Sequence, residues 1–146
     1  MSTLLRKSKP ALAILTVVLA ACAILNMSDM NNKEVRVTLS GANEVPPVNT
    51  SASGGGTIFV AADKSISGGI TTTGVAGTAA HIHIGAAGKN GPVIVPLAKS
   101  GDSGWSVSPG TKITDTQFES FKNGELYINV HSDANKAGEI RAQLIP

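Results

Sequence analysis

Short stretches of alternating apolar and polar residues, separated by glycine-rich turns, most constrain what this chain can fold into. In "EVRVTLSG" the apolar residues Val35, Val37 and Leu39 fall on every second position. Neighbouring side chains on a strand point to opposite faces, so this period of two is typical of a half-buried β-strand. Similar runs recur to the C-terminus, which predicts an all-β domain, an antiparallel β-sandwich or Greek-key barrel.

Further runs locate the other elements that we expect. "GTIFVAAD" and "SISGGITTTGV" form a hairpin around Asp63 and Lys64, whereas Pro46 and Pro47 make "NEVPPVNTSASGG" a loop. "AAHIHIG", "VIVPLAK", "ELYINVHSD" and "GEIRAQLIP" are strands, with Pro96 placing the second of these near a sheet edge. One short helix near 114–123 is predicted, capped by Thr114 or Asp115.

The N-terminus has the form of an export signal. Arg6, Lys7 and Lys9 precede fifteen residues without a charge, at 11–25. "LAAC" resembles the bacterial lipobox, in which the cysteine, here Cys22, is lipidated and becomes the mature N-terminus. We therefore expect a lipoprotein-type signal peptide at 1–21, a polar tether at 22–33 and a β domain at 34–146. The alternative is an uncleaved membrane anchor. Both place the domain outside the cytoplasm, membrane-anchored in the periplasm or at the cell surface.

Charge and composition narrow the possible functions. Three of the 12 basic residues precede Cys22, which leaves nine basic against ten acidic residues in the exported part. With no basic patch and only 3% aromatic residues, nucleic acid is not an expected partner. Cys22 is the only cysteine, so a metal site in the folded part must use nitrogen and oxygen ligands.

The three histidines of the chain all fall on the polar face of a predicted strand. His81 and His83 alternate with Ile82 and Ile84, and His131 alternates with Val130. We expect this face to be solvent-exposed, and the histidines to meet if their strands are neighbours. Two imidazoles two residues apart on a strand are about 6–7 Å apart, and a third would complete a nitrogen set that suits copper or zinc. The alternative is a polar face whose histidines only form hydrogen bonds.

Three separated segments of the chain resemble one known family. "LSGANEVPPV", "AAHIHIGAAGKNGPVIVPL" and "LYINVHSDANKAGEIRAQL" are together similar to the CHRD domain, named after chordin, over about residues 35–146. The chain has Ser132, Lys136 and Ala142 where members usually have Thr, Pro and Gly. The resemblance implies an all-β module of exported proteins. Its motif includes the positions of all three histidines and of four further polar residues: Glu44, Asn129, Glu139 and Arg141.

Three functions follow as expectations, and the first two are not enzymatic. The first is a binding module with a copper or zinc site formed by His81, His83 and His131. Other polar residues would then orient the imidazoles: Tyr127, Asn129, Glu139, Arg141 and Glu44. The second is a cell-envelope interaction or structural module without metal, which binds a protein partner. The third is a metal-dependent oxidoreductase, because copper–zinc superoxide dismutase is also a β-sandwich with a His-x-His strand. The chain lacks the zinc loop and the cysteine pair of that enzyme, and shared architecture does not carry activity.

Overall fold

The computed structural model describes residues 32–146, which contain eight strands, one α-helix and one 3-10 turn. The signal peptide, Cys22 and nearly all of the predicted tether lie outside the described residues. No helix within 32–146 is long and apolar enough to span a membrane. The strands are β1 (Asn32–Ser40), β2 (Ser53–Ala61), β3 (Ile66–Thr73), β4 (Gly77–Ile84), β5 (Val93–Ser100), β6 (Gly104–Val107), β7 (Leu126–Ser132) and β8 (Ile140–Leu144).

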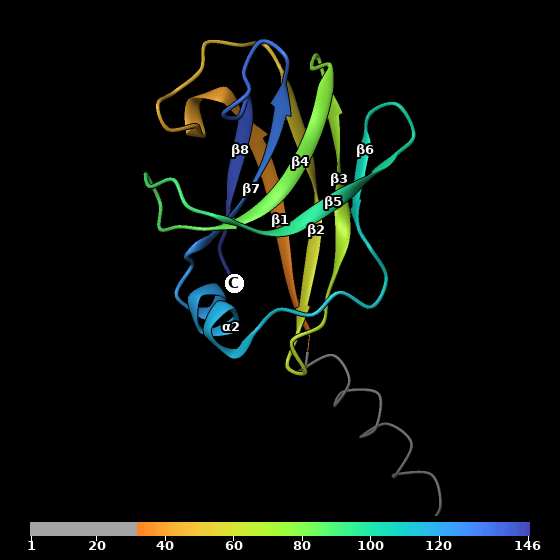
Figure 1. Ribbon diagram of the computed structural model, residues 1–146, viewed down its shortest axis with the longest axis vertical. Helices are drawn as coiled ribbons and strands as arrows, with labels where there is room; N and C mark the ends of the chain where they lie inside the picture. Colours follow the sequence, from red (N-terminus) through yellow and green to blue (C-terminus); the bar gives the residue numbers. More distant parts are fainter. Residues whose placement is uncertain (1–31) are drawn as a thin grey trace, which may run out of the picture. The chain divides into compact units, whose positions relative to one another are not determined.

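The strands close into an antiparallel barrel in the order β1-β2-β3-β6-β5-β4-β7-β8, with β8 pairing back to β1 (Figure 1). Strands β6 and β5 lie between β3 and β4 in the barrel, so β3 and β4 follow one another along the chain but do not pair. This arrangement confirms the all-β antiparallel fold. It also places β4 beside β7, which makes the strands that carry the three histidines neighbours.

The barrel is filled by aliphatic side chains from alternate positions of its strands. Val35, Val37 and Leu39 of β1 are buried, as the alternation in "EVRVTLSG" predicts. Ile82 of β4 and Ile128 of β7 are fully buried in the same core. Because β-branched side chains pack well on a pleated surface, this sequence favours strands over helices.

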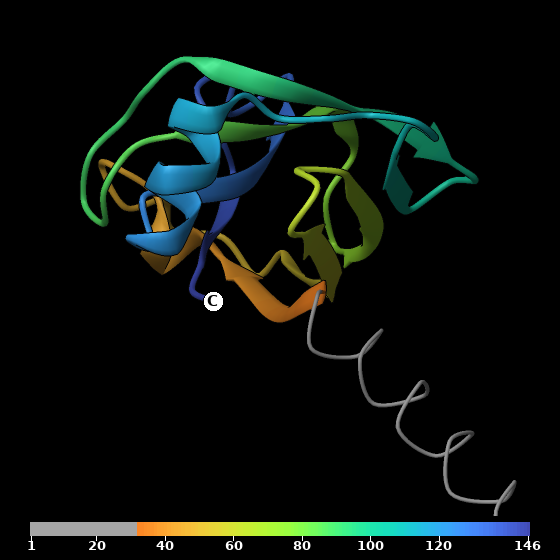
Figure 2. The ribbon, with the colours of Figure 1, turned by 90° about the horizontal axis from the view of Figure 1, so that it is seen from below.

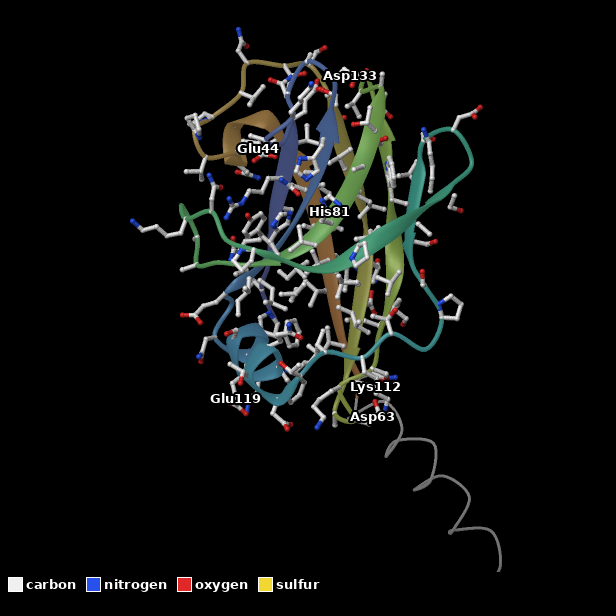
Figure 3. All side chains as sticks on the ribbon, viewed as in Figure 1. Glu44, Asp63, His81, Lys112, Glu119 and Asp133 are labelled. Carbon is white, nitrogen blue, oxygen red and sulfur yellow. The ribbon has the colours of Figure 1, made fainter. Side chains whose placement is uncertain are left out.

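The helix α2 (Asp115–Lys122) lies at the end of the barrel that also holds the β2–β3 turn (Figures 1 and 2). Thr114 is its N-cap and forms a capping box with Gln117, so the predicted cap is confirmed. Phe121 is completely buried and joins the core. An ion pair of 2.8 Å between Asp63 and Lys112 ties the β2–β3 turn to the segment before α2 (Figure 3).

Three expectations about the strands need correction. The four-residue strand β6 was not predicted, because "GDSGWSVSPG" is dominated by turn residues. β5 is not an edge strand, since it pairs with β4 on one side and β6 on the other. Pro96 is tolerated because the pairing with β6 begins only at Leu97. β1 begins at Asn32, so the last two residues of the predicted tether, 32–33, belong to it.

Candidate metal centre

The polar residues that the sequence singled out lie together on the outer face of β4, β7 and β8. His83 is opposite Tyr127, and His81 is opposite Asn129, which in turn is opposite Arg141. The same unbroken register sets His131 opposite Ala79, whose small side chain leaves room for the imidazole, and the register shifts only beyond this pair, between Gly77 and Ala79.

This face is not the solvated surface that the alternation predicted. His83 is only 7% exposed, and Asn129 and Arg141 are each 2% exposed, whereas His81 and His131 are half-buried. The connecting segments at 85–92 and 133–139 form hydrogen bonds with side chains of this face. The segment at 41–52 is tied to them through Asn90 and Glu139. The expectation of a solvent-exposed face is therefore wrong for His83, because alternation along a strand does not reveal which loops fold over it.

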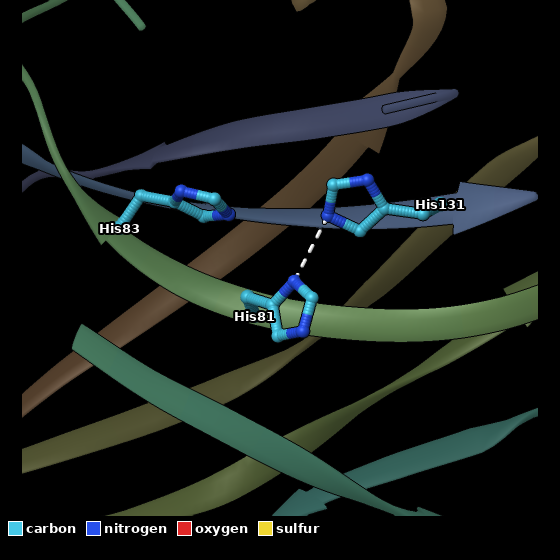
Figure 4. A group of neighbouring side chains, drawn as sticks. All are labelled: His81, His83 and His131. Atoms are coloured by element: carbon cyan, nitrogen blue, oxygen red, sulfur yellow. Dashed lines mark hydrogen bonds between the residues drawn. The ribbon is translucent and has the colours of Figure 1, made fainter. Parts of the chain in front are cut away.

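The three imidazoles converge on one point between β4 and β7 (Figure 4). His81 Nδ1 and His131 Nε2 are 3.0 Å apart. One ring nitrogen from each of His81, His83 and His131 lies within 4.8 Å of the other two. Nitrogen ligands about 2.0–2.1 Å from a tetrahedral ion are about 3.3 Å apart, so one pair already fits and the widest pair must close by roughly 1.5 Å.

Backbone carbonyl groups hold two of the rings by their Nδ1 atoms. His83 Nδ1 donates to the carbonyl of Gly91 at 2.9 Å, and His131 Nδ1 donates to that of Lys136 at 3.0 Å. The neutral form of each imidazole therefore has its proton on Nδ1 and a lone pair on Nε2. His83 Nε2 is buried and has no hydrogen-bond partner. A carbonyl on Nδ1 with a free Nε2 is the arrangement found around metal-bound histidines.

Burial also keeps two of the imidazoles in their neutral form. Burial lowers the pKa of His81, and its neighbours His131 and His83 lower it further. Burial likewise lowers the pKa of His83, although its bond to the Gly91 carbonyl acts in the opposite direction. Because only a neutral imidazole binds a metal ion, both rings have the charge state of a ligand at neutral pH. His81 Nδ1 donates to His131 Nε2 in the metal-free protein, so the His81 proton moves to its Nε2 when Nδ1 binds the ion.

Tyr127 connects the histidine cluster to the 85–92 loop. Its ring stacks on that of His83, with centroids 4.7 Å apart, and the Arg141 guanidinium lies 3.4 Å from the Tyr127 centroid. The Tyr127 hydroxyl accepts a hydrogen bond from the Gly91 amide at 3.1 Å. A Cβ atom at Gly91 would lie 1.7 Å from the Ile84 carbonyl oxygen, so only glycine allows the loop to approach this closely.

We expect Tyr127→Phe to lower the free energy of unfolding by about 1 kcal/mol, because the Gly91 amide loses its partner while the stacked ring remains. Urea denaturation of the metal-free protein measures this change. Phe118→Leu, in α2, is a control on an aromatic ring outside this face. An unchanged stability of Tyr127→Phe would show that the hydroxyl does not hold the loop.

Arg141 joins two loops beneath the cluster. It donates to the Lys89 carbonyl at 2.8 Å and to the side-chain oxygen of Asn90 at 3.0 Å. Asn90 in turn donates to the carbonyl of Val45 at 2.7 Å, so the 85–92 and 41–52 segments are linked. Arg141 therefore supports the loop that holds His83 and does not contact a histidine nitrogen by hydrogen bonding.

Glu44 comes from the segment after β1 (Figure 3), and its carboxyl group interacts with the side chain of Asn129. Its side chain is 5% exposed, and its Oε1 atom has no hydrogen-bond partner. Burial raises the pKa of Glu44 to about 7, although the positive charge of Arg141 opposes the shift. Gly138 has a φ of 138°, which side chains rarely adopt, and a Cβ atom there would lie 2.4 Å from Glu44 Oε1, so this position favours glycine as well.

Glu139 has a different role from Glu44, the other acidic residue near this face. Its carboxylate accepts hydrogen bonds from the hydroxyls of Thr50, at 2.8 Å, and Ser132. The Ser132 bond lowers the pKa of Glu139, which therefore stays charged at neutral pH. Glu139 ties the 41–52 segment to the β7–β8 turn and forms no hydrogen bond with any of the three histidines.

Sequence reasoning missed the backbone groups of this site. The carbonyls of Gly91 and Lys136 orient His83 and His131, and the side chains of Asn90 and Thr50 tie down the loops. The glycines in "GKNGP" and "KAGE" were the available signal, since each marks a turn where the backbone approaches another group closely.

Comparison with known proteins returns one match. The family model of the CHRD domain matches residues 35–144, which span all eight strands and all three histidines. No curated protein and no solved structure matches the chain.

Proposed function

The chain belongs to the CHRD domain family, and we propose that its β-barrel domain binds one copper or zinc ion through His81, His83 and His131. The observation that carries this proposal is the pair of imidazoles whose Nδ1 atoms are bound to carbonyls, so that their Nε2 atoms keep lone pairs directed at one point. The third ring supplies Nδ1 at 3.0 Å from one of them.

The donor set supports these two metals over others. Three imidazole nitrogens suit zinc and copper, whereas calcium and magnesium prefer oxygen ligands. Tyr127, Arg141 and Glu139 hold the loops that position the rings. We propose a binding role, because the residues around the histidines are engaged in holding loops and imidazoles in place.

Elemental analysis and titration of the purified protein, without a histidine tag, test the proposal. We expect one copper or zinc ion per chain, with a dissociation constant below about 1 μM. No ion bound at micromolar concentrations would overturn it, and the polar face would then serve to anchor loops in an interaction or structural module. Redox cycling of a bound copper ion would instead favour the oxidoreductase function.

We also propose that the domain is exported and held at a membrane by a lipid on Cys22. The basic N-terminus, the apolar run and "LAAC" support this proposal. In a bacterial host we expect the protein in the membrane fraction, with a mass that lacks residues 1–21 and includes a lipid. Cys22→Ser should abolish both the processing and the lipid. If Cys22→Ser still associates with the membrane, and both this variant and the native protein retain residues 1–21, the N-terminus is an uncleaved anchor.

A further inference from the structure

Asn129 lies at the centre of the polar face with its side-chain oxygen unpaired. The side chain is 2% exposed, and Oδ1 is buried without a hydrogen-bond partner. We propose that Asn129 Oδ1 is a fourth ligand of the ion held by the three histidines, an inference that rests on the proposed function. A buried amide oxygen that is left unpaired costs free energy, which a bound cation would offset.

The strand register places Asn129 against the cluster. It is directly opposite His81 in the β4–β7 pair, and it lies two residues before His131 on the same face of β7. Its side chain also interacts with the imidazole of His83. Asn129 is thus the polar side chain that adjoins all three histidines.

The amide nitrogen of Asn129 points away from the histidines. Nδ2 donates a long hydrogen bond of 3.5 Å to the Ala137 carbonyl. It also lies beside Glu44 Oε1, because a Cβ atom built on Gly138 would be 2.6 Å from Nδ2 and 2.4 Å from that oxygen. With Nδ2 directed toward the β7–β8 turn, Oδ1 of the same planar amide is directed away from that turn.

Within the described residues, three buried side-chain acceptors have no hydrogen-bond partner. Glu44 Oε1 lies on the Nδ2 side of the Asn129 amide, and the other two are Asn129 Oδ1 and His83 Nε2. Two acceptors that face one region are satisfied together by a cation. Three imidazole nitrogens with one amide oxygen make a four-coordinate set, which fills the tetrahedral shell of zinc. Closed shells of this kind hold an ion, whereas catalytic zinc keeps a position for water. The fourth ligand thus favours retention of the ion over chemistry on it.

Cobalt(II), a spectroscopic substitute for zinc, tests the fourth ligand. We expect Asn129→Ala to change the visible d–d bands of the bound cobalt and to weaken zinc binding at least about 100-fold, more than the loss of a group that only orients a ligand. Asn123→Ala, at the C-cap of α2, is the matched control and should change neither. An unchanged cobalt spectrum in Asn129→Ala would overturn this inference while the three-histidine site stands. If the native protein binds neither metal, the proposed function itself fails.

A second measurement needs no variant. In the native protein, the side-chain amide resonances of Asn129 should shift when one equivalent of zinc is added, because coordination of Oδ1 polarises the amide. If the resonances of the three imidazoles move while those of the Asn129 side chain stay in place, Asn129 is not a ligand. This outcome applies even if Asn129→Ala does not fold.

Discussion

His131→Ala is expected to weaken zinc binding at least about 100-fold while the barrel stays folded. A ligand contributes more than the groups that orient it, and loss of an orienting group alone typically costs 10–100-fold. His131 is half-buried, and within residues 32–146 its side chain bonds only to His81 and to the Lys136 carbonyl. Removing the ring therefore leaves little of the core disturbed. Isothermal titration with zinc measures the affinity, and circular dichroism verifies the fold.

Thr78→Ala provides a matched control for this variant. Thr78 is exposed on the neighbouring strand, and its hydroxyl contacts only the backbone carbonyl of His131. We expect its zinc affinity to equal that of the native protein. Equal affinities of His131→Ala and Thr78→Ala would contradict a three-histidine site. Unfolding of metal-free His131→Ala would instead assign His131 a structural role.

Glu44→Gln is expected to stabilise the metal-free protein at high pH and to change the pH dependence of its stability. The pKa of Glu44 is raised from 4.5 to about 7 in the folded state, so between these values the folded protein binds more protons than the unfolded chain. The free energy of unfolding of the native protein therefore falls as the pH rises through this window. A shift of this size corresponds to about 3 kcal/mol.

Urea denaturation at pH 4 and pH 8 measures this effect. Relative to that of the native protein, the free energy of unfolding of Glu44→Gln should rise by about 3 kcal/mol between pH 4 and pH 8. Glu119→Gln, on the exposed surface of α2, should show no comparable change. If the unfolding free energies of the two variants depend on pH in the same way, Glu44 is not protonated near neutral pH in the folded protein.

Most of the fold follows from alternation alone. Val35, Val37 and Leu39 are buried because every second residue of a half-buried strand faces the core. Thr114 could be identified as a cap because its hydroxyl and the side chain of Gln117 satisfy amides at the start of the helix. β6 could not be predicted, since its four residues are stabilised by pairing with strands distant in sequence.

The candidate site was only partly accessible to sequence reasoning. The face shared by His81 and His83 follows from strand geometry, but the approach of His131 depends on the pairing of β4 with β7. Burial of the face depends on loops that are held by carbonyls, such as that of Gly91. Every residue has a carbonyl group, so no residue type reveals which carbonyl an imidazole will meet.

The most direct test of the metal centre is the long-range proton–nitrogen spectrum of the three imidazoles, recorded before and after one equivalent of zinc. We predict that Nε2 of His83, Nε2 of His131 and Nδ1 of His81 shift together, while Nδ1 of His83 and His131 keep their protons. These are the atoms that converge in the metal-free protein. Ring nitrogens that remain unchanged with zinc present would contradict a metal centre at this site.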